Sequence, residues 1–232
     1  MKQLLIISFI FIYNLFGQTD SLTVISKDIY KCTEDTSVSV KISYPQLINL
    51  QNKDVQDKIN LLLENYFSQA LQNYEEFISD SEYIADYPAD WAFYFETSFR
   101  TTYLTNDFFS VVMDYYEFTG GAHGNHFSQG FNIKLSDGEL FYLGDIIKES
   151  QLENLSLFCE QEILKQFEAN SLSDVLFEDE INIKEDQDFY IKPGYLVIQF
   201  DPYEIAPYAM GSIEVEISFD RIKNLLKPNI KF

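Results

Sequence analysis

Residues 37–74 have the sequence SVSVKISYPQLINLQNKDVQDKINLLLENYFSQALQNY, which holds the two patterns that decide the fold. The first eight residues alternate polar and apolar side chains, which predicts a half-buried strand that ends at Pro45. From Val55 to Tyr74 apolar residues recur at steps of three and four, which predicts an amphipathic helix with Asn52 as its N-cap. Both strand and helix are therefore expected in this part of the chain.

Three further strands are predicted downstream of this helix, at 91–104, 108–118 and 127–135. Asn106-Asp107 and Ser136-Asp137-Gly138 supply turn residues at the ends of these strands. Such short connections favour antiparallel pairing of neighbouring strands.

The C-terminal part is expected to form a helix at 151–167, strands at 195–200 and 213–219, and a short final helix at 221–226. Because strands and helices come in blocks rather than in strict alternation, the expected fold class is α+β. We expect two closely packed lobes of mostly antiparallel sheet, each with a helix packed on it.

The N-terminus has the pattern of a secretory signal peptide. Lys2 supplies a positive charge, residues 4–16 are almost all apolar, and Gly17 precedes polar sequence. This apolar run is shorter than the roughly 20 residues that a membrane span needs, although an uncleaved anchor is the alternative. We therefore expect a signal peptide at 1–17, lobes at 18–138 and 139–232, no membrane span after cleavage, and an extracytoplasmic (periplasmic or secreted) location.

The net charge of -21 arises from 37 acidic and 16 basic residues. A chain that is 46% hydrophobic has enough apolar material for a folded core, so this charge belongs to a strongly acidic surface. Nucleic acid is excluded as a partner, because phosphate contacts need Lys and Arg. Basic proteins, cations and neutral ligands remain as partner classes.

The two cysteines, Cys32 and Cys159, permit one disulfide of long loop or two free thiols. Cys159 falls on the apolar face of a predicted helix, where a thiol behaves as a small hydrophobic group. We favour free thiols.

The segment TGGAHGNH, residues 119–126, connects two predicted strands and holds both histidines of the chain. Gly120 and Gly121 permit positive backbone φ angles. Two histidines lack the further ligands that zinc requires, so neither a metal nor another cofactor is expected. His123 either hydrogen-bonds to buried backbone or acts as a general base, for which its reference pKa is suitable.

A second connection, DPYEIAPYAMG at 201–211, contains two prolines that limit its freedom. Rigid loops present aromatic side chains at a low entropy cost, which makes Tyr203 and Tyr208 candidate contact residues. The other interpretation is that Ile205 and Tyr208 close the end of the core.

Five segments together resemble a known family: ISYPQL (42–47), NKDVQDKIN (52–60), TGGAHG (119–124), LGDII (143–147) and FDPYEIAPYAMGSIEV (200–215). They are similar to the paired extracytoplasmic domains of unknown function in the bacterial anti-sigma factor RsiV and the peptidoglycan deacetylase PdaC. The resemblance identifies the first lobe with the PdaC-type domain and the second with the RsiV-like C-terminal domain. It covers nearly the whole chain after the signal segment.

The resemblance implies a cell-envelope module, since the corresponding region of the anti-sigma factor binds lysozyme. The chain has no room for a deacetylase domain or a cytoplasmic segment, so we expect a non-enzymatic binding or sensing module. Its expected partner is a basic protein such as lysozyme, or peptidoglycan, and an acidic surface would steer a basic protein toward it. The candidate contact residues are Gly120, Gly121, His123, Tyr203, Glu204 and Tyr208.

Two alternatives remain open. One is a cell-wall-acting hydrolase or deacetylase-related enzyme centred on His123, and the other is a purely structural component of the envelope.

Overall fold

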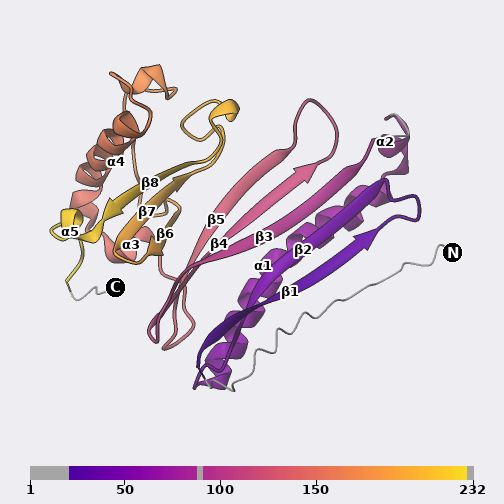
Figure 1. Cartoon of the computed structure of the whole chain (residues 1–232), viewed down its shortest axis with the longest axis horizontal. Coiled ribbons are helices and arrows are strands. Elements are labelled where there is room, and N and C mark those ends of the chain that lie inside the picture. Colours follow the sequence, from indigo (N-terminus) through magenta and orange to yellow (C-terminus); the bar gives the residue numbers. More distant parts are fainter. Residues whose placement is uncertain (1–20, 88–90, 229–232) are drawn as a thin grey trace. The chain divides into compact units, whose positions relative to one another are not determined.

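The computed structural model describes residues 21–87 and 91–228 and confirms a mixed α+β fold with two sheets (Figure 1). The predicted signal segment, residues 1–17, lies outside the described residues. The chain forms two compact units: an N-terminal unit of Met1–Phe99 and Met113–His126, and a C-terminal unit of Arg100–Val112 and Phe127–Phe232. The lobe boundary expected at residue 138 and the packing of the lobes on each other stay predictions.

The larger sheet has five strands in the order β1-β2-β3-β4-β5. Its strands are β1 (Thr23–Cys32), β2 (Val38–Ile48), β3 (Phe93–Leu104), β4 (Phe108–Phe118) and β5 (Asn125–Lys134). β1 pairs with β2 in the antiparallel sense, whereas β2 and β3 pair in parallel from Val38↔Phe93 to Ile42↔Thr97. This parallel pair is unexpected for a mostly antiparallel sheet, and it requires the helical crossover that connects β2 to β3.

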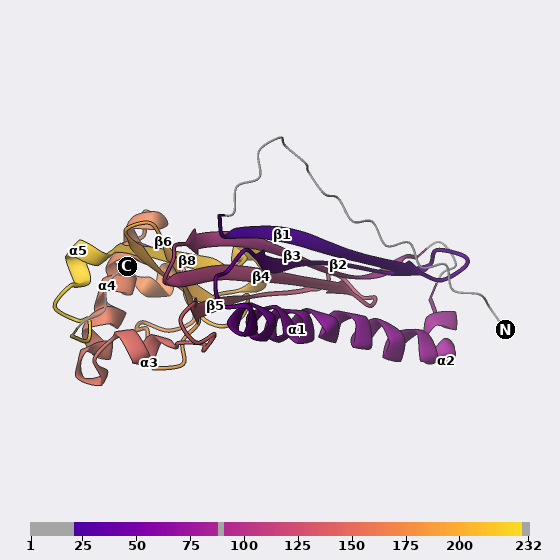
Figure 2. The ribbon, with the colours of Figure 1, turned by 90° about the horizontal axis from the view of Figure 1, so that it is seen from below.

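That crossover consists of α1 (Lys53–Ser79) and α2 (Ser81–Ala85), and α1 packs along β2 on one face of the sheet (Figure 2). As predicted, Asn52 is the N-cap of α1, because its side chain accepts hydrogen bonds from the backbone N–H groups of Asp54 and Val55. The predicted apolar stripe is buried, and its fully buried members are Val55, Ile59, Leu63, Phe67, Ala70 and Tyr74.

The expectation that Pro45 ends its strand is wrong, because β2 continues to Ile48. Proline is tolerated in a strand where no ladder hydrogen bond is needed from its nitrogen. β3 pairs with β2 only as far as Ile42, so Pro45 lies beyond that ladder. Further along, the side chain of Asn60 on α1 pairs with both backbone groups of Leu47, at 2.8 and 2.9 Å.

The C-terminal unit contains a three-stranded antiparallel sheet in the order β6-β7-β8. Its remaining elements are α3 (Leu143–Ile146), η1 (Glu149–Gln151), α4 (Leu152–Gln166), η2 (Leu172–Asp174), β6 (Phe189–Lys192), β7 (Tyr195–Phe200), η3 (Tyr208–Met210), β8 (Ile213–Ser218) and α5 (Phe219–Ile222). α4 packs against β8, and Leu155, Cys159 and Ile163 on its inner face are fully buried. Neither cysteine is in a disulfide, as we favoured.

Strand β6 was not predicted, since four residues are too few to show a period. It lies at an edge of its sheet, and buried side chains from β4 and β5 satisfy its outer backbone groups. Asn132 donates from Nδ2 to the carbonyl of Phe189 at 2.8 Å, and the N–H of Ile191 donates to Ser110 Oγ at 3.0 Å. Ser110 in turn donates to Asn132 Oδ1 at 2.7 Å. A side chain on Gly130 would meet the Phe189 carbonyl oxygen at 2.1 Å, so only glycine permits this close approach.

In the described part of the chain, no helix is both long and apolar enough to cross a membrane.

Replacing Asn132 with Ala should lower the free energy of unfolding by about 1–3 kcal/mol, because the buried carbonyl of Phe189 would lose its donor. Urea denaturation of the chain without residues 1–17 measures this change. Asn170→Ala, at an exposed position, is the control and should change stability by about 0.5 kcal/mol or less. Equal stability of the two variants would mean that the bond to β6 contributes nothing.

Candidate binding surface

The loop between β7 and β8 begins with a tight turn at residues 201–204. The N–H of Glu204 donates to the carbonyl of Asp201 at 3.0 Å, Pro202 occupies the second position, and Tyr203 has a φ of 71° at the third. A positive φ at this position is usual for type II turns and favours glycine, so a tyrosine here is strained. Strain of this kind persists only where surrounding contacts hold it.

Side-chain hydrogen bonds supply those contacts. Glu204 accepts from the N–H of Asp201 and from Gln187 Nε2, both at 2.8 Å. Asp201 accepts from the N–H of Ser128 on β5 at 2.9 Å. The N–H of Tyr203 donates to the carbonyl of Ala206 at 3.1 Å. The turn is therefore held from both of its ends.

The loop divides its side chains between the core and the solvent. Ala206 is fully buried in the core of the C-terminal unit, and Ile205 packs against that core. Tyr203 is 58% exposed, and its ring centroid lies 5.4 Å from that of the partly buried Tyr208. Ile205 therefore contacts the core, as in the interpretation that it closes the end of the core. Tyr203 and Tyr208 instead form a pair on a rigid turn.

Carboxylates surround this turn. Glu204 lines a hollow of about 570 Å³ together with Asp186 and Asp188. Burial, followed by repulsion from Asp201, Glu204 and Asp186, raises the pKa of Asp188 to about 7. A cation brought into this hollow would relieve that repulsion.

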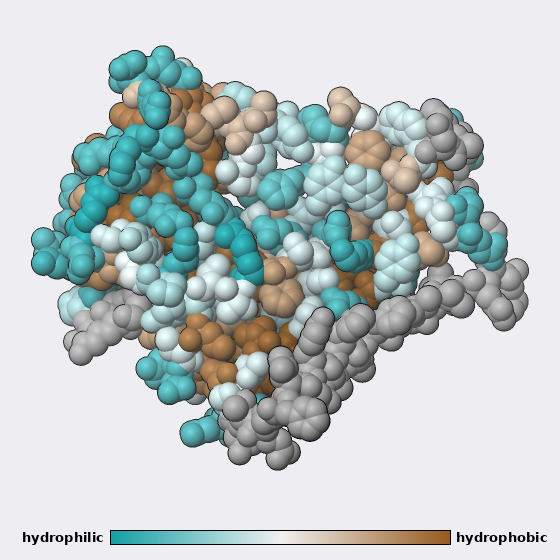
Figure 3. Space-filling model, in the orientation of Figure 1, coloured by the Kyte–Doolittle hydropathy of each residue, from teal (hydrophilic) through white to brown (hydrophobic). Residues whose placement is uncertain are grey.

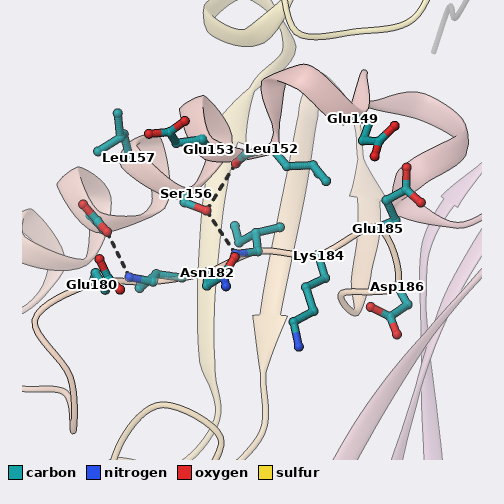
Figure 4. Close-up of a pocket in the computed structure, with 13 residues that line it drawn as sticks. Glu149, Leu152, Glu153, Ser156, Leu157, Glu180, Asn182, Lys184, Glu185 and Asp186 are labelled. Atoms are coloured by element: carbon teal, nitrogen blue, oxygen red, sulfur yellow. Dashed lines mark hydrogen bonds between the residues drawn. The ribbon is translucent and has the colours of Figure 1, made fainter.

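A second acidic groove lies between α4 and the segment 180–186, with a volume of about 790 Å³ (Figure 4). Ser156 and Glu160 on α4 accept the N–H groups of Ile183 and Ile181, at 3.0 and 2.9 Å, which attaches the segment to the helix. The charged residues lining the groove are six acids and one lysine: Glu149, Glu153, Glu160, Glu180, Glu185, Asp186 and Lys184. The same segment lines both hollows, so this region of the C-terminal unit is strongly negative.

The glycine-rich loop at 119–124 belongs to the N-terminal unit, where tyrosines support it. The hydroxyl of Tyr83 donates to the Thr119 carbonyl and lies 2.9 Å from the hydroxyl of Tyr87. A side chain on Gly120, whose φ is 104°, would overlap the ring of Tyr87 at 2.6 Å. A side chain on Gly124 would meet the ring of Tyr116 at 2.4 Å. The loop is shaped by these rings.

Within this loop Gly121 and His123 are exposed. The Nδ1 atom of His123 lies 3.0 Å from the carbonyl oxygen of Gly124, and since a carbonyl oxygen only accepts, this nitrogen is the donor. Among the described residues no group of three or more His, Cys, Asp or Glu side chains could hold a metal ion. The predicted contact residues thus lie in two loops, one in each unit, and their role in binding stays a prediction.

Comparison with known proteins finds two family models along the chain. Residues 31–126 match the family model "Deacetylase PdaC", and residues 144–220 match the model "Protein of unknown function (DUF3298)". The chain carries the paired PdaC-like and DUF3298 domains. The TGGAHG loop lies in the first domain, and the Tyr203 loop lies in the second.

Two proteins from Bacillus subtilis are similar to this chain. Peptidoglycan-N-acetylmuramic acid deacetylase PdaC is 31% identical over 121 residues, which is 51% of this chain. The matched part is only 26% of that deacetylase, so the chain spans about a quarter of it. Anti-sigma-V factor RsiV is 27% identical over 200 residues, covering 83% of this chain and 67% of the relative.

Solved structures of DUF3298 family proteins share the fold of the paired domains. A protein from Bacteroides fragilis has a TM-score of 0.66 over 90% of this chain and 94% of its own. A protein from Pseudomonas aeruginosa has a TM-score of 0.69 over 92% and 98%. Both are 18% identical to this chain, so they establish the fold alone.

The sequence pattern did not reveal which carboxylates lie close together on the acidic surface of the C-terminal unit. Asp188 and Asp201 are 13 residues apart along the chain, and only the pairing of β6 with β7 brings them close. The one available signal in the sequence is the density of acids at 178–188, a pattern that is also typical of an ordinary solvated face. Part of that segment instead forms the wall of two hollows.

Asp188 should make the stability of the DUF3298 domain dependent on pH. An acid with a raised pKa in the folded state takes up a proton on folding, so the free energy of unfolding falls as pH rises from about 4 to about 7. Asp188→Asn should therefore raise the melting temperature at pH 8 and change it less at pH 5. Asp179→Asn, at an exposed position, is the control for the change in net charge. An equal rise in the melting temperature of Asp188→Asn at pH 5 and pH 8 would contradict a raised pKa for Asp188.

Proposed function

We propose that this chain is an extracytoplasmic, non-enzymatic binding module of the bacterial cell envelope, and that it binds a basic protein of the lysozyme class. The observation that carries the proposal is the tyrosine pair of the 201–211 loop, presented on a strained turn beside carboxylates. Rigid, partly exposed aromatic residues are typical energetic centres of protein interfaces. The surrounding acids add electrostatic attraction for a basic partner.

The charge distribution supports a partner that is a protein rather than a small cation. Residues of the segment 181–186 line both hollows, so the negative surface extends over more than one pocket. A folded basic protein can contact the tyrosine pair and this surface together. The similarity to RsiV, an anti-sigma factor, favours a sensing role for such binding.

Tyr203 should be a centre of the interface. In calorimetric titrations with lysozyme, Tyr203→Ala should weaken binding by about thirtyfold or more, because truncation of such aromatic anchors typically costs about 2 kcal/mol or more. Tyr195→Ala, which removes another exposed tyrosine of the same unit, is the matched control and should bind normally.

Tyr203→Gly separates binding from folding. Glycine relieves the positive φ, so this variant should be at least as stable as the unmodified chain and yet bind as poorly as Tyr203→Ala. The affinity of the unmodified chain for lysozyme should decrease when the salt concentration is raised from low to physiological, because salt screens the attraction. Absence of lysozyme binding at either salt concentration would refute the lysozyme proposal.

The alternative is an enzyme acting on the cell wall with His123 as general base. It is favoured by the contact of His123 Nδ1 with the carbonyl of Gly124, which fixes the orientation of the ring. The exposed position of His123 weighs against it, since catalytic groups usually work where water is excluded.

Incubation of the chain with purified peptidoglycan tests the enzyme directly. On the binding proposal, chromatography should detect no released fragment or acetate with either the unmodified chain or His123→Ala. Product formed by the unmodified chain and lost with His123→Ala would instead establish the enzyme.

A further inference from the structure

A row of four aromatic rings crosses the N-terminal unit where β3 begins and β4 ends. The rings follow in the order Trp91, Phe118, Tyr94 and Tyr116, with centroid separations of 5.9, 5.8 and 5.5 Å. Successive ring planes differ by only 35°, 36° and 20°. The rings therefore form one continuous apolar strip rather than separate pairs.

The strip lies on the face of the sheet opposite α1. Side chains alternate along β3, so Phe93 and Phe95 turn toward Phe77 of α1 and are buried, while Tyr94 points to the other face. Figure 2 shows α1 along one face only of this sheet. In the space-filling view, pale and brown side chains gather over the ends of β3 and β4 (Figure 3).

The core of the unit does not enclose this strip. Tyr94 is 37% exposed, and the other three rings are partly exposed. Aromatic surface left in water is a frequent mark of a binding surface. Its size and continuity suit a flat, extended ligand with apolar faces.

Polar groups border the strip on the same face. The register of β2 with β3 places Ser39 beside Tyr94 and Lys41 beside Glu96. Lys41 Nζ and Glu96 Oε1 form an exposed ion pair at 2.8 Å. A hydroxyl, an ammonium and a carboxylate thus provide both donors and acceptors next to the rings.

We propose that this strip binds the pyranose rings of a neutral glycan. The C–H groups on the face of a pyranose carry slight positive charge and are attracted to the negative faces of aromatic rings. Ser39, Lys41 and Glu96 would hydrogen-bond to the sugar hydroxyls, and such polar groups orient ligands on apolar surfaces. A neutral ligand is required, since the chain's net charge of -21 repels polyanions.

This surface goes beyond the proposed binding of a basic protein and uses different residues in the other unit. The two proposals can therefore fail separately. Tyr94→Ala should leave lysozyme binding intact, and Tyr203→Ala should leave glycan binding intact.

Trp91 is the single tryptophan of the chain, so tryptophan emission, excited selectively over that of the tyrosines, reports on the strip alone. Titration of the chain without residues 1–17 with an N-acetylglucosamine tetramer should produce a saturable change in Trp91 emission. Tyr94→Ala should weaken the apparent affinity by about tenfold, whereas Tyr94→Phe keeps the ring and should bind nearly normally. Tyr142→Ala, at a position 59% exposed in the C-terminal unit, is the control and should have no effect.

Retention on insoluble chitin provides a second readout that does not depend on fluorescence. Urea denaturation of each variant verifies that it is folded. The proposal is overturned if the folded chain gives neither a saturable emission change nor retention, or if Tyr94→Ala binds as well as the unmodified chain. A change in Trp91 emission with lysozyme but not with the tetramer would equally overturn it, since the strip would then be a protein-binding surface.

Discussion

The C-terminal unit depends on hydrogen bonds by which side chains of β4 and β5 satisfy the backbone N–H and C=O groups of β6. Strand edges must find partners for their N–H and C=O groups, and here Ser110 and Asn132 supply them instead of another strand. Both side chains are buried, so removing either one leaves a polar group without water. The absence of a side chain at Gly130 allows the backbones to approach.

The same packing places the candidate binding loop. Ser128 on β5 donates its N–H to Asp201 and accepts from Gln199 on β7, so one residue holds both the end of β7 and the first residue of the loop. Arg100 on β3 extends the contact, since its guanidinium lies 4.9 Å over the ring of Tyr190 and pairs with Glu214. The strained turn at Tyr203 is tolerated because this framework is rigid.

Local pattern was sufficient for the elements whose residues interact with near neighbours. The Asn52 cap bonds to residues two and three positions away, and the apolar stripe of α1 follows a local period of three and four residues, so both were correctly predicted. The extension of β2 through Pro45 was missed, because it depends on where β3 stops pairing and on Asn60 reaching from α1. Strand β6 was missed because its stabilising partners lie at positions 110 and 132.

The sequence by itself determined the α+β class, the acidic character and the two loops whose motifs carry the family resemblance. These properties depend on composition and on residues close together in the chain. Only the tertiary structure decided that Tyr203 and Tyr208 pair, that Asp188 lies among other carboxylates, and that four aromatic rings form one strip. The aromatic strip and the cluster of carboxylates require separate strands to be brought into register, and the tyrosine pair requires the turn that the contacts of Asp201 and Glu204 hold in place.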